Sequence, residues 1–193
     1  MKKTQIILTF FLAAVTGSIY GQGQLVLDNL GNSSANPYAT ANGLFWTSTG
    51  GAPALIRQDF NAAFYGGTDS GSLTLLATIL LSDGSGAGDN AGGPGTFAEP
   101  SGKFYTFPGA SSSVFMQIEA WTGNFSSYTA ALGAGAPAAQ SPVFINPVSV
   151  PPGFAPDLVG MPAMVMSIPE PSTSGLAAFG SLCLFLLGRR KLR

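Results

Sequence analysis

Few side chains in this chain could carry out acid–base or nucleophilic chemistry. The chain has no histidine, and Cys183 is its only cysteine. A Ser-His-Asp triad and a Cys-His dyad both need an imidazole as the base, and a His-rich zinc site needs imidazole ligands. The composition therefore excludes these designs for this chain. An intramolecular disulfide is excluded as well, because it needs two cysteines.

Glu119 and Trp121 form the most suggestive pair for chemistry on a sugar. They are two residues apart in an alternating segment, so a strand would place both side chains on one face. An aromatic ring can stack on a sugar while a carboxylate acts on it, but a glycosidase needs a second carboxylate nearby. The sequence places none beside Glu119. We therefore interpret Glu119 as a solvated strand residue and predict no catalytic residue.

Aromatic residues offer a non-catalytic alternative. The central part of the chain is rich in them although it carries little charge, and Trp46 and Trp121 are its two tryptophans. Such rings can form a carbohydrate-binding platform, although aromatic side chains in β-domains mostly pack in or beside the core. Trp46 and Trp121 are thus our candidate carbohydrate contacts, with packing as the alternative.

The segment DGSGAGDN, residues 83–90, spaces hard oxygen donors as a calcium loop does. An EF-hand loop counted from Asp83 would need a carboxylate near position 94, and that residue is Pro94. The glycines do not match a phosphate-binding fingerprint either. We interpret the segment as a flexible loop between strands and predict no metal and no cofactor.

The central part of the chain is acidic, although the whole chain has a formal net charge of −1. Between residues 24 and 167 the only basic residues are Arg57 and Lys103, against Asp28, Asp59, Asp69, Asp83, Asp89, Glu99, Glu119 and Asp157. Nucleic-acid binding needs Lys and Arg on one face to neutralise phosphates. The sequence therefore predicts no nucleic-acid partner.

The hydrophobic pattern predicts an all-β fold. Apolar or alternating runs are separated by stretches rich in Gly, Pro, Ser and Asn, and they fall at residues 24–28, 43–47, 54–57, 60–65, 73–81, 104–107, 114–121, 143–150 and 158–167. Nine short strands predict two packed antiparallel sheets, an immunoglobulin-like or jelly-roll β-sandwich, with a small barrel as the alternative. Residues 126–132 could form a short helical turn.

In two of these runs the hydrophobic pattern also predicts which side chains are buried. Residues 114–121 alternate, so Val114, Met116, Ile118 and Ala120 are expected to face the core. Residues 73–81 are almost wholly apolar, which is typical of a central strand covered on both sides.

Both ends of the chain resemble export signals. Lys2 and Lys3 precede an apolar run over residues 6–15 and a zone of small residues, so residues 1–23 are predicted to be a signal peptide cut by signal peptidase. At the other end, residues 172–188 are apolar and uncharged, long enough for a transmembrane helix. A basic stop signal follows at Arg189, Arg190, Lys191 and Arg193, which predicts a cytoplasmic C-terminus.

The C-terminal tail also carries a family resemblance. Pro169, Glu170 and Pro171, followed by Ser172 and Thr173, the apolar stretch and the basic end, resemble the PEP-CTERM sorting signal of Gram-negative bacteria. The resemblance implies recognition by an exosortase, a Cys-dependent membrane enzyme, with the Pro-Glu-Pro triplet as the recognition element. It also implies transient anchoring in the inner membrane and delivery to the cell envelope or the extracellular space.

The segments FNAAFYGG and MQIEAWTG and the runs that precede the tail are similar to uncharacterised PEP-CTERM proteins of verrucomicrobial type. The expected organisation is a signal peptide (1–23), an exported β-sandwich (24–167) and a sorting signal (168–193). The expected function is a non-catalytic envelope or extracellular-matrix protein linked to exopolysaccharide or biofilm. A carbohydrate-binding module at the cell surface is the alternative, and a secreted enzyme acting through Glu119 is the third hypothesis.

Overall fold

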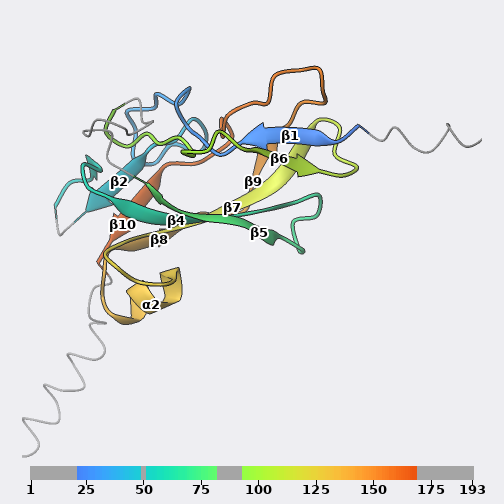
Figure 1. The fold of residues 1–193 in the computed structure, drawn as a ribbon. Coiled ribbons are helices and arrows are strands. Elements are labelled where there is room, and N and C mark those ends of the chain that lie inside the picture. The colour runs from blue at the N-terminus through green and yellow to red at the C-terminus, as the bar shows by residue number, and fades with distance from the viewer. Residues whose placement is uncertain (1–20, 49–50, 82–92, 169–193) are drawn as a thin grey trace, which may run out of the picture.

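Strands dominate the part of the chain that the computed structural model describes, which is residues 21–48, 51–81 and 93–168 (Figure 1). The elements are β1 (Gly23–Val26), β2 (Phe45–Ser48), β3 (Ala54–Leu55), β4 (Phe60–Gly67), β5 (Thr74–Leu81), β6 (Phe104–Phe107), β7 (Ser113–Thr122), α2 (Tyr128–Gly133), β8 (Ala138–Gln140), β9 (Phe144–Pro147) and β10 (Met164–Ser167). The prediction of an all-β fold is confirmed.

The strands form one large sheet and one small sheet. The large sheet has eight strands in the order β3-β2-β10-β8-β7-β4-β5, with β9 paired to β7 beyond β8. The small sheet is the antiparallel pair β1 and β6. Figure 1 shows the small sheet on one side of the large sheet and α2 on the other.

The main core lies between the small sheet and the large one. Leu25 of β1 and Tyr105 and Phe107 of β6 pack in the same cluster as the large sheet's Phe64 and Met116. Its centre is aromatic, because Phe97 lies with its ring centroid 5.5 Å from that of Phe45 and 5.4 Å from that of Phe64. Burial of these side chains is the main stabilising contribution in a domain without disulfides.

Strand β7 follows its predicted alternation. Val114, Met116, Ile118 and Ala120 are all buried and belong to the main core. The long antiparallel pair of β4 and β7 runs from Phe60 opposite Thr122 to Gly67 opposite Phe115. Alternate residues of both strands therefore share each face, and this prediction of core residues is confirmed.

The prediction that residues 73–81 form a central strand is wrong. β5 lies at the end of the large sheet and pairs with β4 alone among the described strands. Ala77 and Ile79 pack against the main core, whereas Leu75 and Leu80 are 56% and 63% exposed. A continuous apolar run is therefore compatible here with an edge strand whose outward side chains are left in solvent.

Two further features differ from the expected pattern. β10 pairs with β2 in parallel, so the large sheet is mixed and not purely antiparallel. β8 has the sequence AAQ and was not among the predicted strands. It is too short, and its side chains are too small, to show an alternating hydrophobic pattern. The last predicted strand, 158–167, is shortened to β10, and its first half is a loop in which Leu158 and Met161 are buried.

The helical turn expected over residues 126–132 is present as α2. Ser127 is its N-cap, and the Ser127 hydroxyl accepts a hydrogen bond of 3.2 Å from the Ala130 N–H. No helix within the described ranges is long and apolar enough to span a membrane. The predicted signal-peptide residues 1–20 and the sorting signal from Pro169 onward lie outside the described residues.

Candidate functional site

The side of the large sheet that faces away from β1 and β6 carries Glu119, which the sequence analysis singled out, together with other polar and aromatic side chains. We call it the outward face and define it by Tyr65 of β4, by Phe115, Gln117 and Glu119 of β7, and by Gln140 of β8. The β4–β7 register sets Tyr65 opposite Gln117, and the β7–β8 register sets Glu119 opposite Gln140. Residues opposite one another in an antiparallel pair point to the same side, so these five side chains form one surface.

Glu119 is held by two hydrogen-bond donors on this face. The Tyr65 hydroxyl donates to Oε2 over 3.1 Å, and the Gln140 amide donates to Oε1 over 3.0 Å. Burial, followed by the charge of Glu119 and this hydrogen bond, raises the pKa of Tyr65 above its ordinary value. The phenol therefore stays protonated and keeps donating at neutral pH.

The register neighbours of Glu119 bear on the enzyme hypothesis. Ala63 and Gln140 lie directly opposite it on the two flanking strands, and neither is a carboxylate. A glycosidase pair would place its second carboxylate across the bound sugar from the first. The arrangement found here is a fixed hydrogen-bonding carboxylate between two donors, which suits recognition of a polar ligand more than acid–base exchange.

Trp121 does not form an exposed platform, which corrects the prediction of a sugar contact at this residue. It is 2% exposed and packs with Ala131 of α2, Ala138 of β8 and Ala63 of β4. Its indole N–H donates to the Phe125 carbonyl over 2.9 Å. The loop and helix that follow β7 thus fold back over this end of the outward face, and Trp121 is the centre of a second, smaller core.

Trp46 is corrected in the same way. It lies on β2 opposite Leu55 of β3 and Val165 of β10, and it is 7% exposed. Its indole nitrogen is buried and has no hydrogen-bond partner among the described residues. A ring with so little accessible surface has no face on which a sugar could stack.

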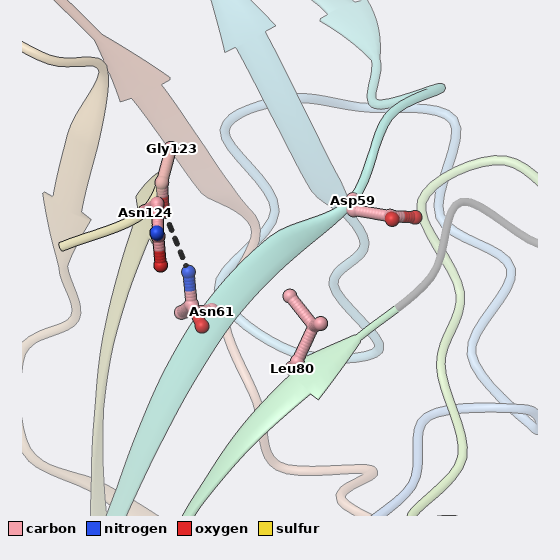
Figure 2. A pocket seen from close by; sticks show the side chains of 5 residues that line it. All are labelled: Asp59, Asn61, Leu80, Gly123 and Asn124. Atoms are coloured by element: carbon pink, nitrogen blue, oxygen red, sulfur yellow. Dashed lines mark hydrogen bonds between the residues drawn. The ribbon is translucent and has the colours of Figure 1, made fainter. Parts of the chain in front are cut away.

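A pocket that sequence reasoning missed opens beside the small core (Figure 2). It has a volume of about 240 Å³ and is lined by Asp59, Asn61, Leu80, Gly123 and Asn124. The Asn61 amide donates to the Gly123 carbonyl over 2.9 Å, which ties the start of β4 to the turn after β7. Asn61 and Leu80 lie opposite each other on β4 and β5, so the pocket adjoins the outward face.

The sequence did not predict this pocket because its lining residues come from three separate segments of the chain. Asp59 and Asn61 lie at the start of β4, Leu80 lies on β5, and Gly123 and Asn124 follow β7. The one local signal is Gly123, whose φ of +83° marks a tight turn that favours glycine. Two amides, a carboxylate and an apolar side chain around so small a space could hold a small polar group.

The remaining predicted sites receive no test from this geometry. The Pro169, Glu170 and Pro171 motif, the basic residues Arg189, Arg190, Lys191 and Arg193, and the whole segment 83–90 lie outside the described residues. Within the described ranges, no group of three or more His, Cys, Asp and Glu residues could hold a metal ion.

No family model, no curated protein and no solved structure matches this chain. What the outward face could bind is therefore inferred from its own side chains.

Proposed function

We propose that this protein is an exported, non-catalytic component of the cell envelope or extracellular matrix, delivered by its C-terminal sorting signal. The observation that carries the proposal is the order of the tail, in which the Pro-Glu-Pro triplet, an uncharged apolar stretch and a basic end follow one another within residues 169–193. On this proposal signal peptidase and an exosortase are transient partners, and the link to exopolysaccharide or biofilm follows from the same resemblance.

The end of the folded domain supports this proposal. β10 lies inside the large sheet between β2 and β8, and it ends at Ser167, two residues before Pro169. A sorting enzyme could therefore engage the triplet while the sheet stays intact. We propose on this basis that residues 24–167 are the exported unit and that its two facing sheets form a β-sandwich.

The test is the mass and location of the mature protein in its native host. We expect wild-type chains to end near Pro171 and to leave the inner membrane. Chains in which Pro169, Glu170 and Pro171 are replaced by Ala should keep Arg193 and stay in the inner membrane. A wild-type chain that keeps Arg193 and remains there would reduce the tail to a plain anchor.

Carbohydrate binding is the second candidate, because the outward face combines half-buried aromatic rings with fixed polar groups. Tyr65 and Phe115 are half-buried, and Glu119 and Gln117 are oriented by hydrogen bonds, the latter to the Ser141 carbonyl over 3.2 Å. Saccharides are bound by ring stacking together with hydrogen bonds from such preoriented groups. The face replaces Trp46 and Trp121 as our candidate contact surface.

Retention of the full chain, in detergent, on the host's secreted polysaccharide and on cellulose would test this candidate. We expect Glu119→Gln and Tyr65→Phe each to weaken retention by about tenfold, which corresponds to about 1.4 kcal/mol. Phe154→Ala is the matched control, because Phe154 is 98% exposed and distant in sequence from the outward face. Equal retention of all four proteins, or none by the wild type, would reject carbohydrate binding and leave the sorting proposal unaffected.

A further inference from the structure

Two segments from opposite ends of the domain meet through hydrogen bonds, and both carry side chains with oxygen atoms. One is the turn at residues 28–32 that follows β1, and the other is the Asp157–Leu158 step that precedes β10. The Leu158 N–H donates to the Asp28 carbonyl over 2.8 Å, and the Gly31 N–H donates to Asp157 Oδ2 over 3.2 Å. These contacts place the Asp157 side chain beside the turn that carries Asp28.

The carboxyl groups of Asp28 and Asp157 share a hydrogen bond, which two ionised carboxylates could not make. Burial, followed by the charge of Asp157 and a hydrogen bond to it, raises the pKa of Asp28 to about 7, although a hydrogen bond from the Leu30 N–H acts in the opposite direction. Arg57 and Lys103 are the only basic residues within the described ranges, and neither contributes to this shift. The pair therefore lacks a counter-charge from the described part of the protein.

Two side-chain oxygen atoms of the turn at residues 28–32 are buried without a donor. Asp28 Oδ1 and Asn32 Oδ1 have no hydrogen-bond partner among the described residues. Asn32 is 4% exposed, and its amide nitrogen donates to the Gly43 carbonyl over 3.0 Å and to the Leu158 carbonyl over 3.1 Å. Because both of those partners are acceptors, turning the amide over would set oxygen against oxygen, so the orphan atom is the oxygen.

Gly31 keeps the approach to Asp157 open. A Cβ at this position would lie 2.9 Å from Asp157 Oδ2, so the Asp157 side chain would have to shift to make room for it. A buried acceptor without a donor costs free energy, and two neighbouring half-buried carboxylates repel each other once both are ionised. A cation bound among these oxygens would remove both costs at once.

We propose that Asp28, Asn32 and Asp157 form a calcium site that fastens the turn after β1 to the segment before β10. The donors are all hard oxygens, two of them carboxylates, and they lie on loops that permit the irregular geometry and added waters that calcium accepts. Magnesium demands a stricter octahedron and fits such loops less well. The proposed site has only two acidic ligands, and its third ligand is the amide oxygen of Asn32.

Calcium titration of the full chain in detergent, after removal of metals with a chelator, tests the proposal directly. We expect saturable binding by calorimetry, and at least tenfold weaker binding by Asp157→Asn. Asp89→Asn is the matched control, because it removes one carboxylate from the segment 83–90 and should leave the affinity unchanged. Gly31→Ala should also weaken binding, although it removes no ligand.

Thermal unfolding separates lost binding from lost folding. Asp157→Asn removes the repulsion within the pair, so without metal its Tm should equal or exceed that of the wild type. Calcium at millimolar concentration should raise the Tm of the wild type and leave that of the variant unchanged. No wild-type binding, binding abolished by Asp89→Asn but kept by Asp157→Asn, or an equal response to magnesium would each overturn the proposed site.

Discussion

At the residue scale, Glu119 and Trp121 show how one strand face can hold two different roles. Both side chains leave β7 on the side away from the main core, as their spacing predicted. Glu119 meets solvent and two donors, whereas Trp121 is sealed beneath α2. The difference arises from the chain that follows β7, because it folds back over only one end of the face.

We expect Trp121→Ala to lower the free energy of unfolding by about 3–5 kcal/mol, since it leaves a large cavity and removes the hydrogen bond to Phe125. Chemical denaturation of the full chain would measure the change. Phe154→Ala is the control and should stay within about 0.5 kcal/mol of the wild type, because its ring is 98% exposed. If Trp121→Ala had the same free energy of unfolding as the wild type, the Trp121 ring would not be buried in a core.

The Asp28–Asp157 pair should make stability depend on pH in the absence of metal. The folded state raises the pKa of Asp28 from 3.8 to about 7, so it binds the proton more tightly than the unfolded chain does. The contribution is fully present below about pH 4 and is lost as the pH rises through about 7. Allowing for screening by solvent, we expect a loss of about 2 kcal/mol across this window.

Denaturation of the full chain with chelator present, at several pH values, would check this dependence. Asp157 is the titratable group that faces Asp28, so Asp157→Asn should make the pH dependence shallower, while the part that arises from burial of Asp28 remains. A wild-type stability that rises between about pH 4 and pH 7 would contradict the expected sign.

At the element scale, β5 is the strand whose surroundings the sequence predicted least well. Its uncharged run TLLATILL contains neither Pro nor Lys, the residues that commonly protect an edge strand from pairing with other chains. Ala77, Ile79 and Leu81 face the core, while Leu75 and Leu80 are exposed. Such an edge is expected to promote association at high concentration.

We therefore expect Leu80→Lys to reduce concentration-dependent association, measured by light scattering, while changing stability by no more than about 0.5 kcal/mol. Leu80 is 63% exposed, so a charge there stays hydrated. Ile79→Lys is the matched control on the opposite side of the strand, where it packs against the main core, and it should destabilise the domain. Equal effects of the two substitutions would contradict the edge position of β5.

At the scale of the whole molecule, the parallel pair of β2 and β10 joins the second strand of the described chain to its last strand. Gly43, just before β2, permits this closure. A Cβ there would lie 2.1 Å from the Ala163 backbone nitrogen and 2.2 Å from the Pro162 carbonyl carbon. Backbone on both sides leaves no flexible side chain that could move aside.

Gly43→Ala is expected to destabilise the full chain by on the order of 3 kcal/mol or more, because the pairing of β2 with β10 would have to shift. Thermal unfolding would measure the loss. Gly51→Ala is the control, since a Cβ at that position meets nothing within 4 Å. Similar Tm values for the two variants would show that the segments before β2 and β10 do not need this close approach.

The sequence by itself determined most of the strand positions, the core side of β7 and the chemistry that the composition excludes. These properties are local: a two-residue period, a turn residue or a missing imidazole can be read within a few positions. Phe104–Phe107 was predicted to the residue, and the short helical turn expected over residues 126–132 overlaps α2.

Only the tertiary structure decided which strand lies at the edge, which tryptophan is sealed and which polar groups meet. Glu119 reaches Tyr65 and Gln140 through strand pairing, and Asp28 reaches Asp157 across almost the whole domain. Such contacts depend on sheet order and register. Chain segments with the same local pattern can pair in many ways, and the order that buries the most apolar surface with its backbone hydrogen bonds satisfied is a property of the whole fold.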